Sequence, residues 1–339
     1  MTIDYATLDA RALGLATHLC TRDELERWAA LPDVSSLARA METAGRLAVP
    51  LPPATRAADI DQAQRRTVAS FVAQLERWAG PRNPVLDAFH AEQDRRSLRA
   101  LMRGVVEGAA AEARLAGLLP TPSLTLPVLE ELARAHSPRE IATRLFVLGD
   151  VHAQVLVALT AQLPVDLLEV ELALARVLAE RWRQAARRGD AALRERLLAG
   201  IDLANAQAAL ELAGPAHDFD ALPLFIAGGQ ALDRKTFIAA ATAKSRDAAS
   251  AELARALPGT ALVAWVRDAS GNPASLEAAE LSDRLSALQR RRRTDPLGSA
   301  PVQWFLARLA AQSVDIRRLC WGLALGVPAA ALREGLVTP

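Results

Sequence analysis

Cysteine is nearly absent from this chain of 339 residues: Cys20 and Cys320 are the two present, and they stand near its opposite ends. A small secreted scaffold would need more, so we expect no disulfide framework but two buried thiols in a reducing compartment. Aromatic residues make up only 4% of the chain, which disfavours an all-β fold. No apolar run reaches ~18 residues and the N-terminus lacks a signal-peptide pattern, so we expect a soluble, cytoplasmic protein.

An excess of one charge is absent too, since 40 Lys and Arg residues face 39 Asp and Glu residues, for a net charge of +1. Without a basic surplus, nothing indicates a nucleic-acid partner. The chain also lacks the His-Glu-x-x-His, Gly-x-Ser-x-Gly, Walker and Cys/His metal-binding patterns. We therefore predict no catalytic, cofactor-binding or metal-binding residues, and no enzymatic activity. His90 and Asp94, one helical turn apart, are interpreted as a surface pair.

What the chain does have is one helical pattern that occurs three times. Each copy carries two helix-capping residues twelve positions apart, at Thr21 and Asp33, at Thr125 and Ser137, and at Asp233 and Ser245. Apolar residues stand at the same places in each copy: Leu25, Leu129 and Phe237 in the first helix, and Met41, Leu145 and Leu253 in the second. Gly45, Gly149 and a Pro258–Gly259 pair are typical of helix ends. Each copy thus predicts two short helices, and the first and second copies carry a capping-box pattern at Thr21 and at Ser137.

Longer helices are predicted after these short pairs, at Ile60–Trp78, Val165–Arg188 and Leu276–Arg293, because each shows apolar residues at three- and four-residue spacing. The fold class is therefore all-α. We divide the chain into three similar helical modules, residues 1–110, 111–215 and 216–339. We expect the C-terminal helices to pack back against the first module. Three like modules joined head to tail can close into a ring.

An acidic residue recurs at about one-module spacing, at Asp94, Asp202 and Asp315, each with an apolar residue four positions later. An acid in a first helical turn complements the helix dipole, which explains part of this pattern. We also take the three as candidate partner contacts. The run Arg290, Arg291, Arg292 and Arg293 ends a long helix and is a further candidate, for an acidic partner or for anionic headgroups beside a membrane.

Four segments together resemble the C-type subunit of bacterial and archaeal V/A-type (vacuolar/archaeal-type) rotary ATPases, the relative of the d-type subunit of eukaryotic V-ATPases. The segment Val314–Val337 is similar to the family's closing element, an acidic-x-Arg-Asn-Leu-Arg helix followed by a short helix. Gly200–Asn205 is similar to its central Glu-Ile-Asp-x-x-Asn-Leu element, and Leu224–Gly229 to the Gly-Gly turn that opens its third module. Ala12–Leu37 is similar to its opening pattern.

This resemblance implies a funnel of three helical domains around a pseudo-threefold axis. Its mouth receives the lower end of the central rotor shaft, and its base sits on the membrane proteolipid ring. The chain would then be a non-catalytic central-stalk component on the cytoplasmic face, peripheral to the membrane, that serves proton or sodium transport without a cofactor.

Two other functions stay open at this point. One is a helical scaffold or adaptor, unrelated to ATPases, that binds a partner helix in a central groove. The other is an all-α enzyme with a pocket at a module interface, although the sequence offers no set of ionisable residues to nominate for it.

Overall fold

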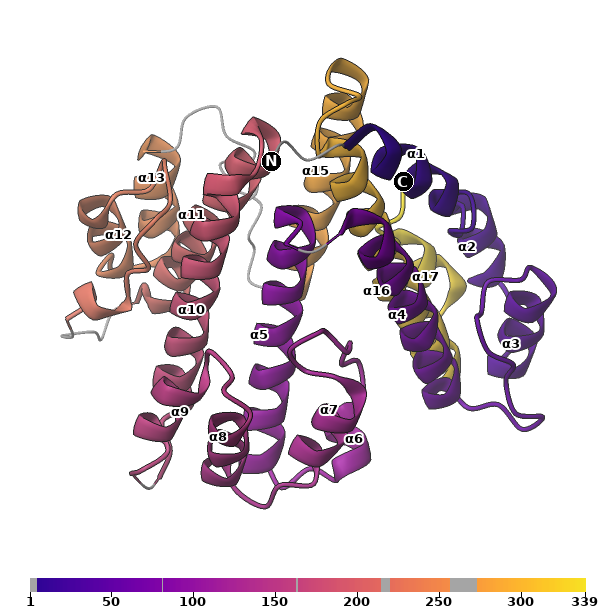
Figure 1. Cartoon of the computed structure of the whole chain (residues 1–339), viewed down its shortest axis with the longest axis horizontal. Helices are drawn as coiled ribbons and strands as arrows, with labels where there is room; N and C mark the ends of the chain where they lie inside the picture. Colours follow the sequence, from indigo (N-terminus) through magenta and orange to yellow (C-terminus); the bar gives the residue numbers. More distant parts are fainter. Residues whose placement is uncertain (1–4, 81, 163, 215–219, 257–272) are drawn as a thin grey trace. The chain divides into compact units, whose positions relative to one another are not determined.

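The computed structural model describes residues 5–80, 82–162, 164–214, 220–256 and 273–339. Within these ranges it holds 16 α-helices and no β-strand, which confirms the all-α prediction for them (Figure 1). The helices are α1 (Tyr5–Ala16), α2 (Arg22–Trp28), α3 (Val34–Thr43), α4 (Ala57–Ala79), α5 (Pro84–Val106), α6 (Ala111–Leu115), α7 (Leu126–Ala133), α8 (Pro138–Val147), α9 (Ala153–Leu159), α10 (Leu167–Arg188), α11 (Ala191–Leu212), α12 (Arg234–Ala241), α13 (Arg246–Ala256), α15 (Pro273–Thr294), α16 (Ala300–Ala324) and α17 (Ala329–Glu334), with a short 3-10 helix at Leu222–Leu224.

Short polar residues begin most of the predicted helices. Thr21 forms a complete capping box, in which its hydroxyl accepts the N–H of Glu24 and the Glu24 carboxylate accepts the N–H of Thr21. Four more caps form as predicted, with the backbone N–H groups of Ser36, Glu140, Thr236 and Ala248 donating to the side chains of Asp33, Ser137, Asp233 and Ser245, respectively. Capping involves residues only three positions apart, so it can be read from sequence.

One predicted cap and one predicted capping box differ from expectation. Thr125 precedes α7, but its hydroxyl accepts no cap hydrogen bond. Pro127 stands in the first turn and has no N–H, so one of the donors that such a side chain uses is missing. At α8 the Ser137 hydroxyl caps the helix, whereas the carboxylate of Glu140 accepts the N–H of His136 instead of closing a capping box.

The long helices and two of the three predicted helix ends are confirmed. α4 and α15 cover the first and third amphipathic segments, and α10 covers the second from Leu167 onward. Gly45 and Gly149 follow α3 and α8 with φ of +64° and +69°, the left-handed conformation expected there. The pair Pro258–Gly259 lies outside the described residues. The six apolar positions shared by the three copies are all buried, Leu25, Met41, Leu129, Leu145, Phe237 and Leu253.

The chain divides into two compact units, each made of segments that are far apart in sequence. The first comprises Met1–Leu86, Glu107–Arg134 and Leu281–Pro339, and the second comprises Asp87–Val106 and Ala135–Glu280. The C-terminal helices therefore belong to the same unit as the N-terminal ones. The three module ranges, and their arrangement around a common axis, stay predictions.

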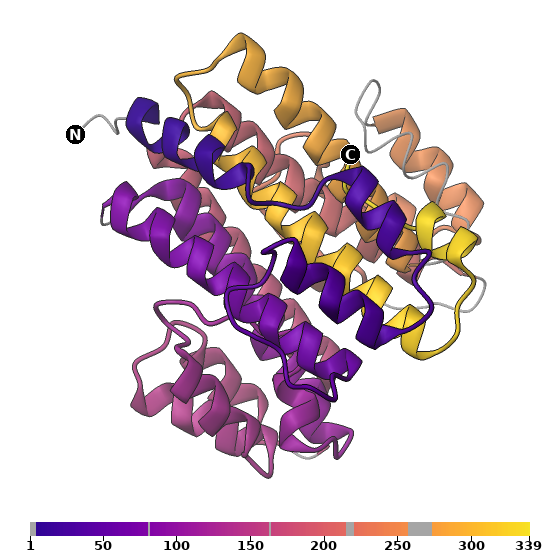
Figure 2. The same cartoon turned by 90° about the vertical axis from the view of Figure 1, so that its right-hand side faces the viewer.

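In the first unit, α16 is the central helix. It packs against α4, α1, α2 and α3, and the indigo N-terminal helices lie beside the yellow C-terminal ones (Figure 2). The core between them joins residues from both ends of the chain, including Leu25, Met41, Ile316, Leu319 and Leu332. Both cysteines are buried and free in this core, as predicted, and burial raises the pKa of each thiol to about 12.

In the second unit, α10 and α11 pack along each other, and α12 and α13 cover α11 (Figure 1). Ala206, Ala209 and Leu210 of α11 meet Phe237 of α12 and Leu253 of α13 in a buried apolar cluster. Small Ala side chains let these helices approach closely, which suits the Ala-rich composition.

Candidate functional site

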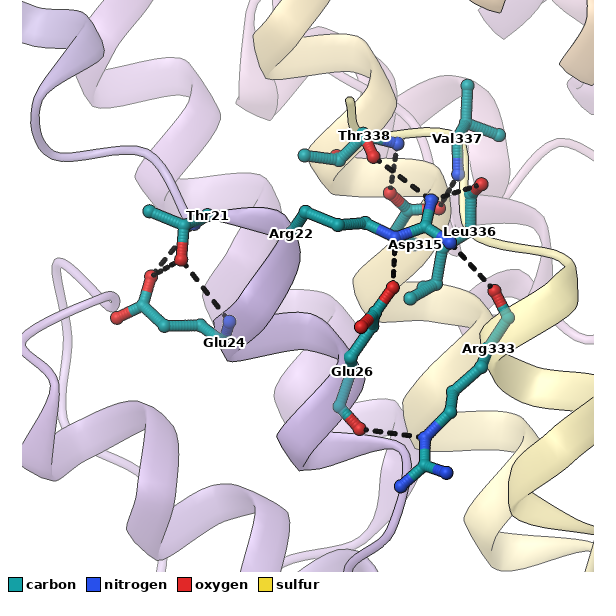
Figure 3. Close-up of polar contacts among 9 residues, drawn as sticks. All are labelled: Thr21, Arg22, Glu24, Glu26, Asp315, Arg333, Leu336, Val337 and Thr338. Carbon is teal, nitrogen blue, oxygen red and sulfur yellow. Dashed lines mark hydrogen bonds and ion pairs between the residues drawn. The ribbon is translucent and has the colours of Figure 1, made fainter.

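The carboxylate of Asp315 lies fully buried on α16 and holds the C-terminal tail. Its two oxygens accept the backbone N–H groups of Val337 and Thr338, each at 2.8 Å (Figure 3). Burial raises the pKa of the Asp315 carboxyl, and these hydrogen bonds offset only part of that effect. The Asp315 carboxylate therefore anchors the last residues of the chain to α16 in the first unit.

Arg22, in the first turn of α2, also binds the C-terminal tail. Its guanidinium donates to the carbonyl oxygens of Leu336 at 3.0 Å, Thr338 at 3.2 Å and Arg333 at 3.2 Å (Figure 3). The carboxylate of Glu26, one turn further along α2, accepts a hydrogen bond from Arg22 at 2.6 Å. The backbone carbonyl oxygen of Glu26 accepts a second hydrogen bond, from the guanidinium of Arg333. The tail is thus tied both to α16 and to α2. We call this arrangement the C-terminal clasp.

The capping box at Thr21 is part of the support for this clasp. Arg46 donates to the Glu24 carboxylate at 2.8 Å and to the carbonyl oxygen of His18 at 2.9 Å. Partial burial by itself would raise the pKa of Glu24. The hydrogen bonds from the Thr21 N–H and from Arg46, with the charge of Arg46, lower it by more, so the pKa of Glu24 lies below its ordinary value. The start of α2 is therefore fixed where Arg22 needs it.

Asp202 performs a similar task in the second unit. Its buried carboxylate on α11 accepts three consecutive backbone N–H groups, from Gln230 at 3.0 Å, Ala231 at 2.9 Å and Leu232 at 3.0 Å. Gly229 packs so closely that an added Cβ would collide with this carboxylate. The segment that leads into α12 is thereby fixed to α11.

Asn205, one turn after Asp202, extends this contact. Its side-chain amide donates to the carbonyl oxygen of Ile226 at 2.8 Å and accepts the N–H of Ile226 at 2.9 Å. Gly200–Asn205 and Leu224–Gly229, two of the segments that resemble the family, therefore contact each other in the fold. Their contacts fix the segment before α12 to α11.

Asp94 on α5 is fully buried, and its carboxylate pairs with Arg181 of α10 at 2.6 Å. The interpretation of His90 and Asp94 as a surface pair is wrong, because both side chains are buried. Next to this pair, the indole N–H of Trp182 donates to the carbonyl oxygen of Ala88 at 3.1 Å. Arg181 is far from Asp94 in sequence, so no local pattern indicated the pair.

The arginine run at the end of α15 has two kinds of members. The guanidinium of Arg292 lies 4.0 Å from the ring centre of buried Trp304, and Arg308 approaches the same ring at 5.5 Å. Partial burial, with the nearby charge of Arg293, lowers the pKa of Arg292. Arg290 and Arg293 are exposed. Arg292 thus packs within the first unit, Arg291 is half-buried, and the exposed pair faces solvent.

The three predicted aspartates share one feature that sequence reasoning missed: each carboxylate is buried and bonded within the chain. Their role as partner contacts stays a prediction, and such a role would act through the segments that they hold. Arg22 was missed as well, because its acceptors are carbonyl groups at the far end of the chain.

Among the residues that the structure describes, no three His, Cys, Asp or Glu side chains come together as a metal site. Over the same residues, no helix has the length and apolar character required to cross a membrane. What the geometry offers is a set of charged groups that fix helices and chain ends in place.

The family model described as ATP synthase (C/AC39) subunit matches residues 8–335. The chain belongs to this family. A comparison with curated proteins found no match. As a member of the C/AC39 family, the chain is a component of a rotary ATPase of the V/A type, which confirms the resemblance and excludes the alternative of a scaffold unrelated to ATPases.

Proposed function

We propose that this C/AC39 family member is a non-catalytic part of the central rotor, which couples the rotor shaft to the membrane proteolipid ring. The family match over residues 8–335 carries this proposal. In it, the three modules 1–110, 111–215 and 216–339 form a funnel with pseudo-threefold symmetry. Shaft subunits enter its mouth, and its base rests on the ring at the cytoplasmic face, where the ring moves protons or sodium ions.

The buried charge contacts support a mechanical role. A part that transmits torque must not shear, so its helix ends and chain ends need fixed positions. The C-terminal clasp joins α2, α16 and the tail with hydrogen bonds in which one partner is charged, and such bonds are stronger than neutral ones. Asp202 fixes the start of α12 by the same means. These contacts would stiffen each unit against rotation-driven strain.

The proposal is tested by binding of the full chain to its two partners. The purified chain is mixed with the shaft protein and with the detergent-solubilised proteolipid ring of the same host, and a stator protein of the same complex serves as the negative control. We expect one chain to bind shaft and ring at the same time. Binding to neither the shaft nor the ring would refute the proposal.

A further inference from the structure

Two arginine side chains meet at one indole ring in the first unit. The guanidinium of Arg292, near the end of α15, lies 4.0 Å from the ring centre of Trp304, and that of Arg308, on α16, lies 5.5 Å from the same centre. Trp304 is buried, and both arginines are half-buried. The fold therefore holds two like charges at one place.

A cation–π contact by itself needs only one guanidinium. The chain offers a comparison at Trp78 on α4, where the guanidinium of Arg11 lies 5.0 Å from the ring centre. At Trp304, a second guanidinium adds repulsion between like charges to the attraction that the ring provides. The arrangement at Trp304 therefore favours a neutralising anion, whereas the one at Trp78 does not need it.

The electrostatics of Arg308 reflect this repulsion. Burial lowers the pKa of Arg308; Cys20 and Asp315 act in the opposite direction, and the charge of Arg292 lowers the pKa further. One amino group of the Arg308 guanidinium donates to the carbonyl oxygen of Cys20 at 2.9 Å, but its buried Nε–H has no hydrogen-bond partner. Arg308 thus keeps an unused donor near the charge of Arg292.

Two other pairs of arginines in the chain share an acidic side chain. In the first unit, the carboxylate of Asp61 lies 3.3 Å from Arg65 and 3.1 Å from Arg317. The second such group consists of Glu171 with Arg99 and Arg103. Within the described ranges, neither Arg292 nor Arg308 forms an ion pair with an acidic side chain. The comparison predicts that an anion from outside the chain takes the place of the missing acid.

The end of α15 adds more positive charge. Arg290 and Arg293 are exposed there, and in the described part of the chain neither they nor the next acid in sequence, Asp295, form an ion pair. Basic residues complement the dipole at a helix C-terminus, but that dipole amounts to only about half a charge. A phosphate group carries about −1.5 to −2 charges at pH 7 and three acceptor oxygens, so it neutralises such a cluster better than a single carboxylate does.

We propose that Arg292 and Arg308 form a binding site for a phosphate group, with Arg290 and Arg293 at its edge. A planar guanidinium can donate two hydrogen bonds to one phosphate, so two guanidiniums supply donors for all of its free oxygens. Inorganic phosphate, the phosphate chain of a nucleotide and a phospholipid headgroup share this chemistry. Binding here needs no other subunit, so its test is separate from that of the rotor role.

Binding is measured on the purified full-length chain at fixed ionic strength. Isothermal titration uses inorganic phosphate, ATP and, as a carboxylate probe, acetate; flotation uses phosphatidylcholine vesicles with and without phosphatidic acid. The main variant is Arg292→Gln, and Arg292→Lys keeps the charge but loses the planar fork. The matched control is Arg11→Gln, which removes the guanidinium from Trp78 in the same unit. Circular dichroism and thermal melting select the variants that fold, and Arg292→Lys decides if Arg292→Gln does not fold.

We expect the wild type to bind at least one phosphate probe, and to bind acetate much more weakly. Arg292→Gln should bind that probe at least about tenfold more weakly, Arg292→Lys should lie between, and Arg11→Gln should match the wild type. Binding of phosphate or ATP would identify a soluble ligand, and binding only of vesicles with phosphatidic acid would identify a headgroup. The site would be overturned by a wild type that binds no probe, by equal affinity for acetate, by wild-type affinity in the folded Arg292 variants, or by an equal loss in Arg11→Gln.

Discussion

Replacing Asp315 with Asn should destabilise the first unit by about 1–2 kcal/mol at neutral pH. The amide retains one oxygen for one of the two N–H groups, from Val337 and Thr338, and turns its own NH₂ towards the other. A hydrogen bond to a charged group is worth about 1.5–3 kcal/mol, so the loss of one sets the upper part of the range. Removing a buried charge relieves its desolvation, which offsets part of that loss.

The pH dependence of this difference has a definite sign. Burial holds the pKa of Asp315 above its ordinary value, so the folded chain keeps the proton to higher pH than the unfolded chain does. The stability of the wild type therefore falls as pH rises through the window between the ordinary and the raised pKa, and the variant lacks this slope. The gap between wild type and variant should be largest at the acid end and narrow towards neutral pH.

Urea unfolding followed by circular dichroism across this pH range measures both effects. Hydrogen exchange at the C-terminal peptide reports the clasp directly, since the amides of Val337 and Thr338 should lose protection in the variant. Asp23→Asn, a change at an exposed carboxylate of α2, is the matched control and should alter stability by less than about 0.5 kcal/mol. If Asp315→Asn shifts neither unfolding nor exchange more than the control does, the clasp is not a stabilising contact.

Three more outcomes follow from the described contacts. Glu24→Gln should cost about 1 kcal/mol at pH 7, and because the pKa of Glu24 is lowered, acid urea titrations should show the difference from wild type shrink as pH falls from the ordinary carboxyl pKa through the lowered one. Since burial raises the pKa of Cys20 and Cys320 to about 12, a thiol reagent at pH 8 should modify them only after unfolding, and rapid native labelling would contradict their burial. Gly229→Ala should lower the melting temperature, at a cost of about 1–3 kcal/mol, by displacing the carboxylate of Asp202; an unchanged melt would show that the segment moves freely.

The local parts of this fold could be predicted from sequence because their causes are local. A cap such as Asp33 needs only the N–H three residues on, and a left-handed Gly149 needs only the end of its own helix. Thr125 failed as a cap for an equally local reason, the missing N–H of Pro127. The helices themselves follow from the spacing of apolar residues, which the burial of Leu145 and Phe237 confirms.

The candidate site was predictable only in part. The recurrence of the three aspartates drew attention to them, yet the pattern gave no sign that they are buried, because their partners come from distant segments. Asp94 meets Arg181 of another helix, and Asp315 meets the last residues of the chain. Phe146, Val147 and Leu148 look like part of a core segment in the sequence, yet all three side chains are exposed at the end of α8.

The proposed rotor role is put to its sharpest test by ATP-driven ion pumping in membrane vesicles of the host, with and without this chain. Hydrolysis and pumping are measured on the same vesicles, and the purified full-length chain is added back to the depleted ones. We expect that depleted vesicles do not pump, although their catalytic part still hydrolyses ATP, and that adding the chain restores pumping. Undiminished pumping in vesicles without the chain would contradict the rotor role.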